Sequence, residues 1–437
     1  MIWAKEETLS REEIEQIQTK KLLKLVSYVY EKVEPYRKKM NDAGIKPEDI
    51  KGLSDLKKLP FTTKQDFRDN YPFGLFAVDK SELVRIHASS GTTGKPTVVG
   101  YTKNDLDMWT ECVARIAAAG GATKEDICQI CFGYGMFTGA LGLHKGLEKV
   151  GACIIPSSTG NSEKQIMYMK DYGTSLLVAT PSYALRLGEV AIQMGLNPQT
   201  DLNIKTALLG SEMLTEAMRT EAKKTYGDKV NITSNYGMSE LCGPGVSGEC
   251  LELNGMHINE DHFICEIIDP NTGEVLPAGE KGELVVTCLS KEALPLIRYR
   301  TRDISSLEYA PCKCGRTTAR MTNLYGRTDD MLKIRGVNVF PSQIEEVLLR
   351  TDEIGPHYEI IVDRKDHSDI LTIRVELTPQ SMTDDFTELD RIRNKLRSQL
   401  RTMLGLDAKI QLESPNTLKR FEGKAKRVTD NRKQNGV

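Results

Sequence analysis

A chain of 437 residues with 39% apolar residues is long enough for one large and one smaller domain, each with its own core. Its formal net charge of −2 gives no overall electrostatic argument for a nucleic-acid or membrane partner. No apolar run approaches the roughly 18 residues that span a bilayer, nothing at the N-terminus predicts export, and we expect the ten scattered cysteines to be reduced thiols or metal ligands of a cytoplasmic protein.

The first predicted element is a helix over residues 11–40, where apolar side chains recur every three or four positions until Pro35 interrupts the pattern. Between about residues 80 and 290, short apolar runs alternate with helical stretches and Gly-rich turns. This alternation predicts an α/β fold with a largely parallel sheet. Its predicted strands include Ser175 to Ala179, Lys205 to Leu209 and Gly282 to Cys288.

The last quarter of the sequence has a different character. Two strands with alternating apolar residues, Tyr358 to Asp363 and Ile370 to Leu377, precede a basic amphipathic helix from Leu389 to Leu404. We therefore expect a large domain over residues 1–328 and a small α+β domain over residues 329–437.

A Gly-rich segment follows the predicted strand Leu83 to His87. Its glycines permit a tight turn with inward-facing amides, its hydroxyls add donors and its lysine adds charge, so it is suited to hold a polyphosphate. It lacks the spacing of a P-loop, and by itself it fits an ordinary flexible loop about as well. Its residues are Ser89, Ser90, Gly91, Thr92, Thr93, Gly94 and Lys95.

Four further motifs follow this loop in order along the chain. They are Tyr236 to Glu240, Tyr299 to Asp303, Gly326 to Gly336 and Glu422 to Ala425. Together the five resemble the ordered motif set of the adenylate-forming superfamily, whose members activate carboxylic acids as acyl-AMP. The resemblance covers about residues 30 to 430 and is most detailed with the phenylacetate-CoA ligase branch. The stretches that carry this detail are Leu59 to Lys64, Gly133 to Gly139, Glu260 to Phe263 and Lys291 to Asp303.

The resemblance implies a large multi-sheet adenylation domain with flanking helices, a small mobile C-terminal domain and an AMP-forming acid-thiol ligase reaction. The reaction would use ATP, Mg²⁺ and coenzyme A, and phenylacetate is the favoured acid. The phosphate loop, with Thr92 as a catalytic member, would hold the β- and γ-phosphates, and Glu240 would be linked to Mg²⁺, while negative charge gathers on the α-phosphate. A homodimer and a role in aromatic acid catabolism are implied by the resemblance alone.

Residues of the later motifs would surround the nucleotide. Tyr236 resembles the family's adenine platform, Asp303 offers paired acceptors that suit the two ribose hydroxyls, and Arg327 would approach the ribose or the α-phosphate. In isolation, each of these side chains would more often be a core aromatic or an ion-pair partner. The other residues of this predicted nucleotide site are Gly210, Ser211, Glu212, Asn235, Gly237, Met238 and Ser239.

The resemblance also assigns the catalytic lysine and the hinge. Lys424 would bridge the substrate carboxylate and the α-phosphate in adenylation only, and Lys426 is the competing assignment. For the thiol step, the small domain would turn about Asp329 and Asp330. The segment Lys333 to Phe340 would then enter the site and help to admit coenzyme A.

The segment Gly133 to Gly139 brings Tyr134, Gly135 and Phe137 together. Aromatic side chains among glycines suit an aromatic ring packed close to the backbone, and in the resembled family this segment lines the acid site. A Gly-rich turn with ordinary core aromatics is the alternative. Hydroxyphenylacetate, indoleacetate and benzoate-like acids satisfy the same pattern as phenylacetate.

A separate set of residues predicts a metal site. Cys312 and Cys314 lie in a Pro/Gly-bounded loop, and Cys250 and His257 stand seven residues apart. Three thiolates and one imidazole form a closed tetrahedral set typical of structural zinc. Buried unpaired cysteines are the alternative to a metal site. The alternative ligands are Cys242, Cys265 and His262.

Two other functions fit parts of the sequence. An adenylating enzyme could pass its acyl group to a carrier protein, and absence of AMP release that depends on coenzyme A would favour it. A zinc-bearing, non-enzymatic binding module associated with nucleic acid would show salt-dependent DNA binding. The nearly neutral charge and the complete set of nucleotide motifs favour the ligase.

Overall fold

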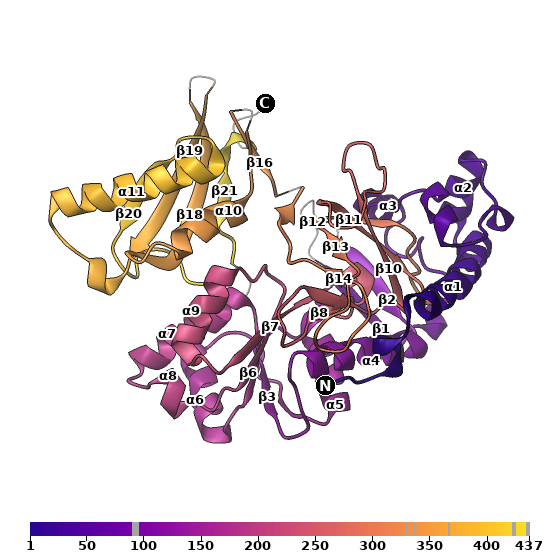
Figure 1. Ribbon diagram of the computed structural model, residues 1–437, viewed down its shortest axis with the longest axis horizontal. Helices are drawn as coiled ribbons and strands as arrows, with labels where there is room; N and C mark the ends of the chain where they lie inside the picture. Colours follow the sequence, from indigo (N-terminus) through magenta and orange to yellow (C-terminus); the bar gives the residue numbers. More distant parts are fainter. Residues whose placement is uncertain (90–95, 329, 336, 366–367, 422–424, 434–437) are drawn as a thin grey trace.

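The computed structural model describes residues 1–89, 96–328, 330–335, 337–365, 368–421 and 425–433. Figure 1 shows a large N-terminal group of sheets and helices and, beside it, a small C-terminal group around α11 (Phe386–Leu404). In the part of the chain that the structure describes, each helix is too short or too polar to cross a membrane.

Two helices open the chain. Helix α1 (Arg11–Lys32) begins with a capping box, in which the Ser10 hydroxyl accepts a hydrogen bond from the Glu13 amide. A new helix, α2 (Glu34–Asp42), starts with Pro35 in its first turn. Proline has no N–H to continue the first helix, which explains the interruption that the sequence predicts.

The largest sheet has nine strands. Its strands in spatial order are β13 (Leu307–Glu308), β14 (Arg320–Met321), β9 (Met256–Ile258), β8 (Ser247–Glu249), β7 (Asn231–Tyr236), β6 (Thr206–Leu209), β5 (Leu176–Ala179), β3 (Ile127–Ile130) and β4 (Cys153–Ile155). The helices that precede, join or follow its parallel strands are α4 (Lys103–Ala119), α5 (Gly139–Val150), α6 (Ser162–Tyr172), α7 (Pro181–Gln193), α8 (Pro198–Asp201) and α9 (Glu216–Tyr226).

Helices cover both faces of the parallel strands. Side chains alternate between the faces of a strand, and in β5 this divides the core in two. Leu176 and Val178 pack in one core with α4 and α5, whereas Leu177 and Ala179 pack in another with α6, α7 and α9. The strands buried on both faces are therefore uninterrupted apolar runs, as the sequence predicts.

The prediction of a largely parallel sheet is correct for only half of this sheet. Parallel pairing joins β4, β3, β5, β6 and β7, but β7, β8, β9, β14 and β13 pair antiparallel. Beyond Tyr236 the connections between the paired strands contain no α-helix to form a parallel crossover. The predicted strand at 282–288 belongs to a separate antiparallel sheet of β10 (Phe263–Ile268), β11 (Gly282–Cys288), β12 (Tyr299–Ser305) and β15 (Gly326–Arg327).

The C-terminal group has its own sheet and core. Its strands in spatial order are β20 (Lys409–Glu413), β19 (Ser368–Leu377), β18 (Ile354–Lys365) and β21 (Val428–Asp430), and α10 (Pro341–Leu349) and α11 pack on them. The hairpin of β16 (Leu332–Ile334) and β17 (Val337–Val339) precedes them. The two strands and the helix expected here are confirmed. The boundary at residues 328 and 329 stays a prediction, since Asp329 lies outside the described residues.

Candidate active site

The predicted phosphate loop connects a short hairpin. Strand β1 (Arg85–Ser89) pairs antiparallel with β2 (Thr97–Tyr101), and Ser89 lies opposite Thr97. Ser90, Gly91, Thr92, Thr93, Gly94 and Lys95 lie outside the described residues. On β1, the Ala88 amide donates to the carbonyl of Met136 at 2.9 Å, and His87 Nδ1 lies 3.1 Å from the same oxygen. The hairpin is thus attached to the predicted acid segment.

Close backbone contacts shape the predicted adenine site. A β-carbon on Gly210 would lie 2.5 Å from the side-chain oxygen of Asn235, so only glycine fits beside that amide. Asn235 also donates through Nδ2 to the carbonyl of Leu209 at 3.1 Å. Gly237 packs on Gly243 in the same way. The ends of β6 and β7 therefore meet at one edge, as parallel strands do.

Three predicted nucleotide residues form one hydrogen-bonded chain. Tyr236 Oη donates to Asp303 Oδ2 at 2.6 Å, and Arg327 donates to the other carboxylate oxygen at 2.8 Å. Burial, followed by the neighbouring Asp303 charge, raises the pKa of Tyr236 well above its ordinary value, which keeps the phenol protonated as a donor. The sequence predicts these three residues at the nucleotide but not the bonds between them.

Glu240 lies in a short turn, η5 (Ser239–Leu241), and only 2% of it is exposed. Tyr299 Oη lies 3.4 Å from its carboxylate, and Lys291 Nζ lies 3.4 Å from its backbone carbonyl. Tyr101 Oη donates to the carbonyl of Ser239 at 3.2 Å, and the Lys291 ammonium lies 4.3 Å from the Tyr101 ring centroid. Lys291 and Tyr101 hold the turn through its backbone carbonyls, a role that the sequence analysis missed.

The predicted acid segment is held on two sides. Thr138 Oγ1 lies 3.3 Å from the hydroxyl of Ser239, which joins the segment to the turn of Glu240. Tyr134 Oη lies 3.0 Å from His144 Nδ1, and His144 Nε2 lies 2.9 Å from a carboxylate oxygen of Glu148. Gly135 has a φ of +144°, which side-chain-bearing residues rarely adopt, and Phe137 is 55% exposed.

The predicted catalytic lysine, Lys424, lies outside the described residues. The next residue, Ala425, donates its backbone N–H to Glu212 Oε1 at 2.6 Å. The other oxygen of Glu212 accepts from the Ser182 hydroxyl at 2.6 Å, and Ser211 before it has a φ of +66°. Glu212, predicted at the nucleotide wall, therefore contacts the segment that carries the lysine.

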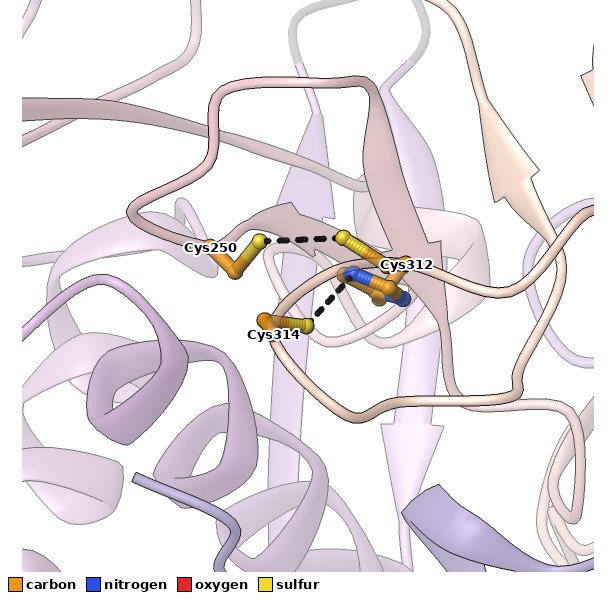
Figure 2. Close-up of side chains that lie close together, drawn as sticks. Cys250, Cys312 and Cys314 are labelled. Atoms are coloured by element: carbon orange, nitrogen blue, oxygen red, sulfur yellow. Dashed lines mark hydrogen bonds between the residues drawn. The ribbon is translucent and has the colours of Figure 1, made fainter.

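The four predicted zinc ligands converge in the structure. The donor atoms of Cys250, His257, Cys312 and Cys314 all lie within 4.8 Å of one another, and Figure 2 shows the three cysteines pointing toward one centre. The sulfurs of Cys250 and Cys312 are 3.8 Å apart. Two thiolates bound to a tetrahedral zinc at about 2.3 Å would be about 3.8 Å apart, so the donor set fits this ion. The alternative ligands Cys242, Cys265 and His262 lie outside the cluster.

The surroundings of the cluster suit metal binding as well. His257 Nδ1 lies 3.2 Å from the Thr318 hydroxyl, which leaves Nε2 facing Cys314 Sγ at 3.4 Å. Burial lowers the pKa of His257 to about 4, which favours the neutral imidazole that metals bind. Arg316 donates to Cys314 Sγ at 3.6 Å and to Glu7 at 2.6 Å. The loop is thereby joined to the N-terminal segment.

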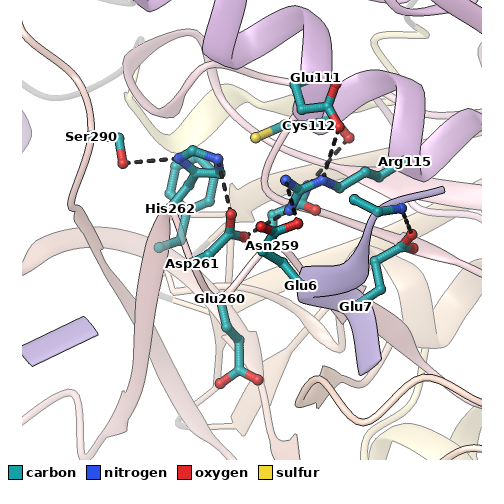
Figure 3. A network of polar contacts seen from close by, with 12 residues as sticks. Glu6, Glu7, Glu111, Cys112, Arg115, Asn259, Glu260, Asp261, His262 and Ser290 are labelled. Carbon is teal, nitrogen blue, oxygen red and sulfur yellow. Dashed lines mark hydrogen bonds and ion pairs between the residues drawn. The ribbon is translucent and has the colours of Figure 1, made fainter. Parts of the chain in front are cut away.

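A buried ionic network lies close to this segment (Figure 3). Arg115 donates to Asp261 at 2.8 Å, and His262 contacts Asp261 at 3.1 Å and Ser290 at 2.9 Å. Burial alone would raise the pKa of Asp261, but the hydrogen bonds of His262 and Arg115 hold it well below its usual range. The sequence resemblance includes Asp261 and His262 but gives no sign of this network, because its partners are far apart in the chain.

Comparisons with known proteins cover nearly the whole chain. The AMP-binding enzyme family matches residues 6–288, and the AMP-binding enzyme C-terminal domain matches residues 336–432. The chain is 47% identical to a phenylacetate-coenzyme A ligase of Thermus thermophilus over 441 residues, 98% of each protein.

Among solved structures, the chain is similar to a 2-hydroxyisobutyryl-CoA ligase in two states. In the postadenylation state with 2-HIB-AMP, the TM-score is 0.92 at 28% identity, covering 98% of this chain and 92% of that one. In the thioesterification state with 2-HIB-AMP and CoA, the TM-score is 0.72 at 28% identity, covering 99% of this chain and 93% of that one.

Proposed function

The chain belongs to the AMP-binding enzymes and, within them, to the phenylacetate-coenzyme A ligases, and from this premise we propose that phenylacetate is its preferred acid. As a member of this family it is an AMP-forming acid-thiol ligase, which joins a carboxylic acid to coenzyme A with ATP through an acyl-AMP intermediate. The preference for an aryl acid is supported by the segment of Tyr134 and Phe137, which lies against the turn of Glu240 through Thr138.

The residues would divide the work of adenylation among them. Asp303, oriented by Tyr236 and Arg327, would accept hydrogen bonds from the ribose hydroxyls, and the edge at Gly210 and Asn235 would receive the adenine. The phosphate loop would hold the β- and γ-phosphates, so that pyrophosphate leaves when the acid carboxylate attacks the α-phosphate. Lys424 would neutralise the charge that develops there, which is the kind of stabilisation that accelerates phosphoryl transfer most.

Mg²⁺ would be held through Glu240. This ion keeps several waters and typically needs one or two carboxylates beside the substrate phosphates, and Glu240 offers a carboxylate in a dry setting. When bound, Mg²⁺ supplies charge neutralisation to the phosphate oxygens. Tyr299 and Lys291 would keep the Glu240 turn in place.

The hydrogen-bonded chain of Tyr236, Asp303 and Arg327 is the observation that supports the nucleotide site, and with it the adenylate-forming reaction. To test it, purified protein is incubated with ATP, Mg²⁺ and a panel of aryl acids, with and without coenzyme A, while AMP, pyrophosphate and thioester are measured. We expect phenylacetyl-CoA and AMP only when acid, ATP and coenzyme A are all present. Pyrophosphate without thioester would point to another acceptor, such as a carrier protein. Stronger turnover with a different acid would refute phenylacetate as the preferred substrate.

A structural zinc ion is a second proposal. The convergence of three thiol sulfurs and one imidazole nitrogen, with spacings that fit a tetrahedral ion, supports it. Metal analysis should find about one zinc per chain, and Cys312→Ser should lower that ratio. Protein with full activity and no zinc would refute this assignment.

Three further expectations concern the class of protein, its assembly and its location. A non-enzymatic zinc-bearing module is wrong as a description of this chain, because the family is shown over nearly its full length. A homodimer is a proposal that rests on the family resemblance, and the mass of the particle in solution tests it. A cytoplasmic location is a proposal that rests on the sequence pattern and the cysteine usage.

We also propose that the C-terminal group stands here in the arrangement used for adenylation. The higher TM-score against the postadenylation state than against the thioesterification state supports this proposal, and so does the contact of Ala425 with Glu212. Asp330 lies 3.7 Å from Arg327 through an ion pair at the junction where the hinge is predicted.

A further inference from the structure

One face of α7 meets the C-terminal group. Ser182, Arg186 and Glu189 are separated by four and three residues, a spacing that aligns them along one side of a helix. Pro356 and His357, near the start of β18, lie opposite this face, and together with Ser182 and Arg186 they line a cavity of about 20 Å³. The two surfaces are in close contact, with space for about one water molecule between them.

An ionic hydrogen bond crosses this contact. His357 Nε2 lies 2.7 Å from Glu189 Oε1, and Arg186 donates to the other oxygen of Glu189 at 3.0 Å. Burial alone would raise the pKa of Glu189, but these hydrogen bonds hold it below its usual value. A carboxylate only accepts, so Nε2 of His357 is the donor. The side chains of His357 and Glu189 are 17% and 28% exposed, so this bond is partly shielded from water.

A second hydrogen bond crosses nearby. Glu212 accepts from the Ala425 amide at 2.6 Å while Ser182 on α7 holds its other oxygen. Arg427, which is paired with Glu345, adds a favourable charge toward Glu212. The bond to Ala425 therefore fixes the backbone of the residue that follows Lys424 in the sequence.

We infer that Glu189, His357 and Glu212 form a latch that holds the C-terminal domain in the adenylating arrangement and must open before the thioester-forming step. The inference rests on the proposed function, in which Lys424 acts in the first step only. These are positioning residues, since they act through the placement of Lys424. Weakening the latch should speed thioester formation and slow adenylation. A general loss of stability would not speed either step.

The test compares two substitutions of His357. His357→Leu removes the donor to Glu189, while His357→Gln keeps an N–H that can reach the carboxylate. Each protein is mixed with acid, ATP and Mg²⁺ to measure pyrophosphate release in a single turnover. Coenzyme A is then added to the preformed enzyme-bound adenylate to measure thioester formation. Glu413→Gln, which breaks an ion pair with Arg374 inside the C-terminal sheet, is the matched control.

We expect His357→Leu to speed thioester formation by about tenfold or more, since loss of a hydrogen bond to a charged group shifts a two-state population by at least that factor. Pyrophosphate release should slow or stay unchanged, and His357→Gln and Glu413→Gln should behave like the wild type. Equal slowing of both steps, or no change in the second, would overturn the latch.

A measurement without substrate separates this proposal from the proposed function. Trypsin cleavage after Arg327 or Lys333, at the junction of the two groups, should be faster in His357→Leu than in His357→Gln at equal thermal stability. Equal cleavage rates would refute the latch even if the enzyme proves to be a phenylacetate ligase. Faster cleavage without turnover of any aryl acid would support the latch and refute the substrate assignment.

Discussion

The large N-terminal group of sheets and helices, here called the base, and the C-terminal group differ in their ion pairs. In the base, buried ion pairs join segments that are distant in sequence, such as Arg115 with Asp261 and Arg316 with Glu7. The C-terminal group also has largely buried pairs, such as Arg427 with Glu345, but several of its pairs are exposed and local, such as Arg391 with Glu388. A buried charge that loses its partner is costly, whereas exposed pairs contribute little. The difference suits a rigid site for the nucleotide and a smaller part that can change its position.

The largest loss of stability is expected from Arg115→Met. The substitution leaves the Asp261 carboxylate buried without its arginine (Figure 3), and removing one partner of a buried pair costs about 3–5 kcal/mol. Denaturant unfolding should show this loss. Arg391→Met, in an exposed pair, should cause a much smaller loss, because solvent screens such pairs. Similar losses from both substitutions would mean that the two regions do not differ in this respect.

The second prediction concerns Lys424, the predicted catalytic lysine of the C-terminal group. Lys424→Ala should slow formation of the acyl-adenylate by about 10²–10³-fold, the usual loss when one group that stabilises developing charge is removed. Thioester formation from supplied acyl-adenylate and coenzyme A should remain, because the lysine is proposed to act in the first step only. Single-turnover assays of each step check this, with Lys426→Ala as the matched control. A larger loss in Lys426→Ala would assign the role to that residue instead.

Local sequence patterns predict many of the strands, one long helix and the set of candidate zinc ligands. The strands at β5, β6, β11, β18 and β19 and the helix α11 follow from apolar periodicity, because period 2 and period 3.6 depend only on nearby residues. Cys250, His257, Cys312 and Cys314 could be grouped because few residue types bind zinc. The strand direction beyond Tyr236 could not be predicted, since it depends on how the connections pack.

Contacts between residues that are far apart in the chain could not be predicted from the sequence either. His357 and Glu189 are 168 positions apart, and Ala425 and Glu212 are 213 apart. Nothing in either local segment distinguishes such residues from ordinary surface charges. Glu212 is an example. Its motif predicts a contact with the nucleotide, whereas in the structure its carboxylate accepts a hydrogen bond from the backbone N–H of Ala425.

Removal of the proposed zinc ion should affect the base more than the C-terminal group. The four ligands would close a loop of more than sixty residues, and we expect an effect on the scale of a disulfide across such a loop, which contributes about 2–4 kcal/mol. Cys312→Ser or a chelator should therefore lower the unfolding midpoint. It should also speed proteolysis of the N-terminal segment, which Glu7 and Arg316 attach to the metal loop. Chelation that leaves both properties unchanged would separate the cluster from the stability of the base.

The smallest expected effect is the pH dependence of the ion pairs of Glu353 in the C-terminal group. A hydrogen bond from Lys395 lowers the pKa of Glu353 from 4.5 to about 2, so its stabilising contribution is complete above about pH 4.5 and disappears as the pH falls toward 2. Because Lys395 and Arg391 are largely exposed, that contribution should stay below about 1 kcal/mol. Unfolding free energies of wild type and Glu353→Gln should therefore differ slightly at pH 7 and converge as the pH falls from about 4.5 to about 2. A gap that widens on acidification would mean that Glu353 is stabilised as the protonated acid, the reverse of the ionic role assigned to it.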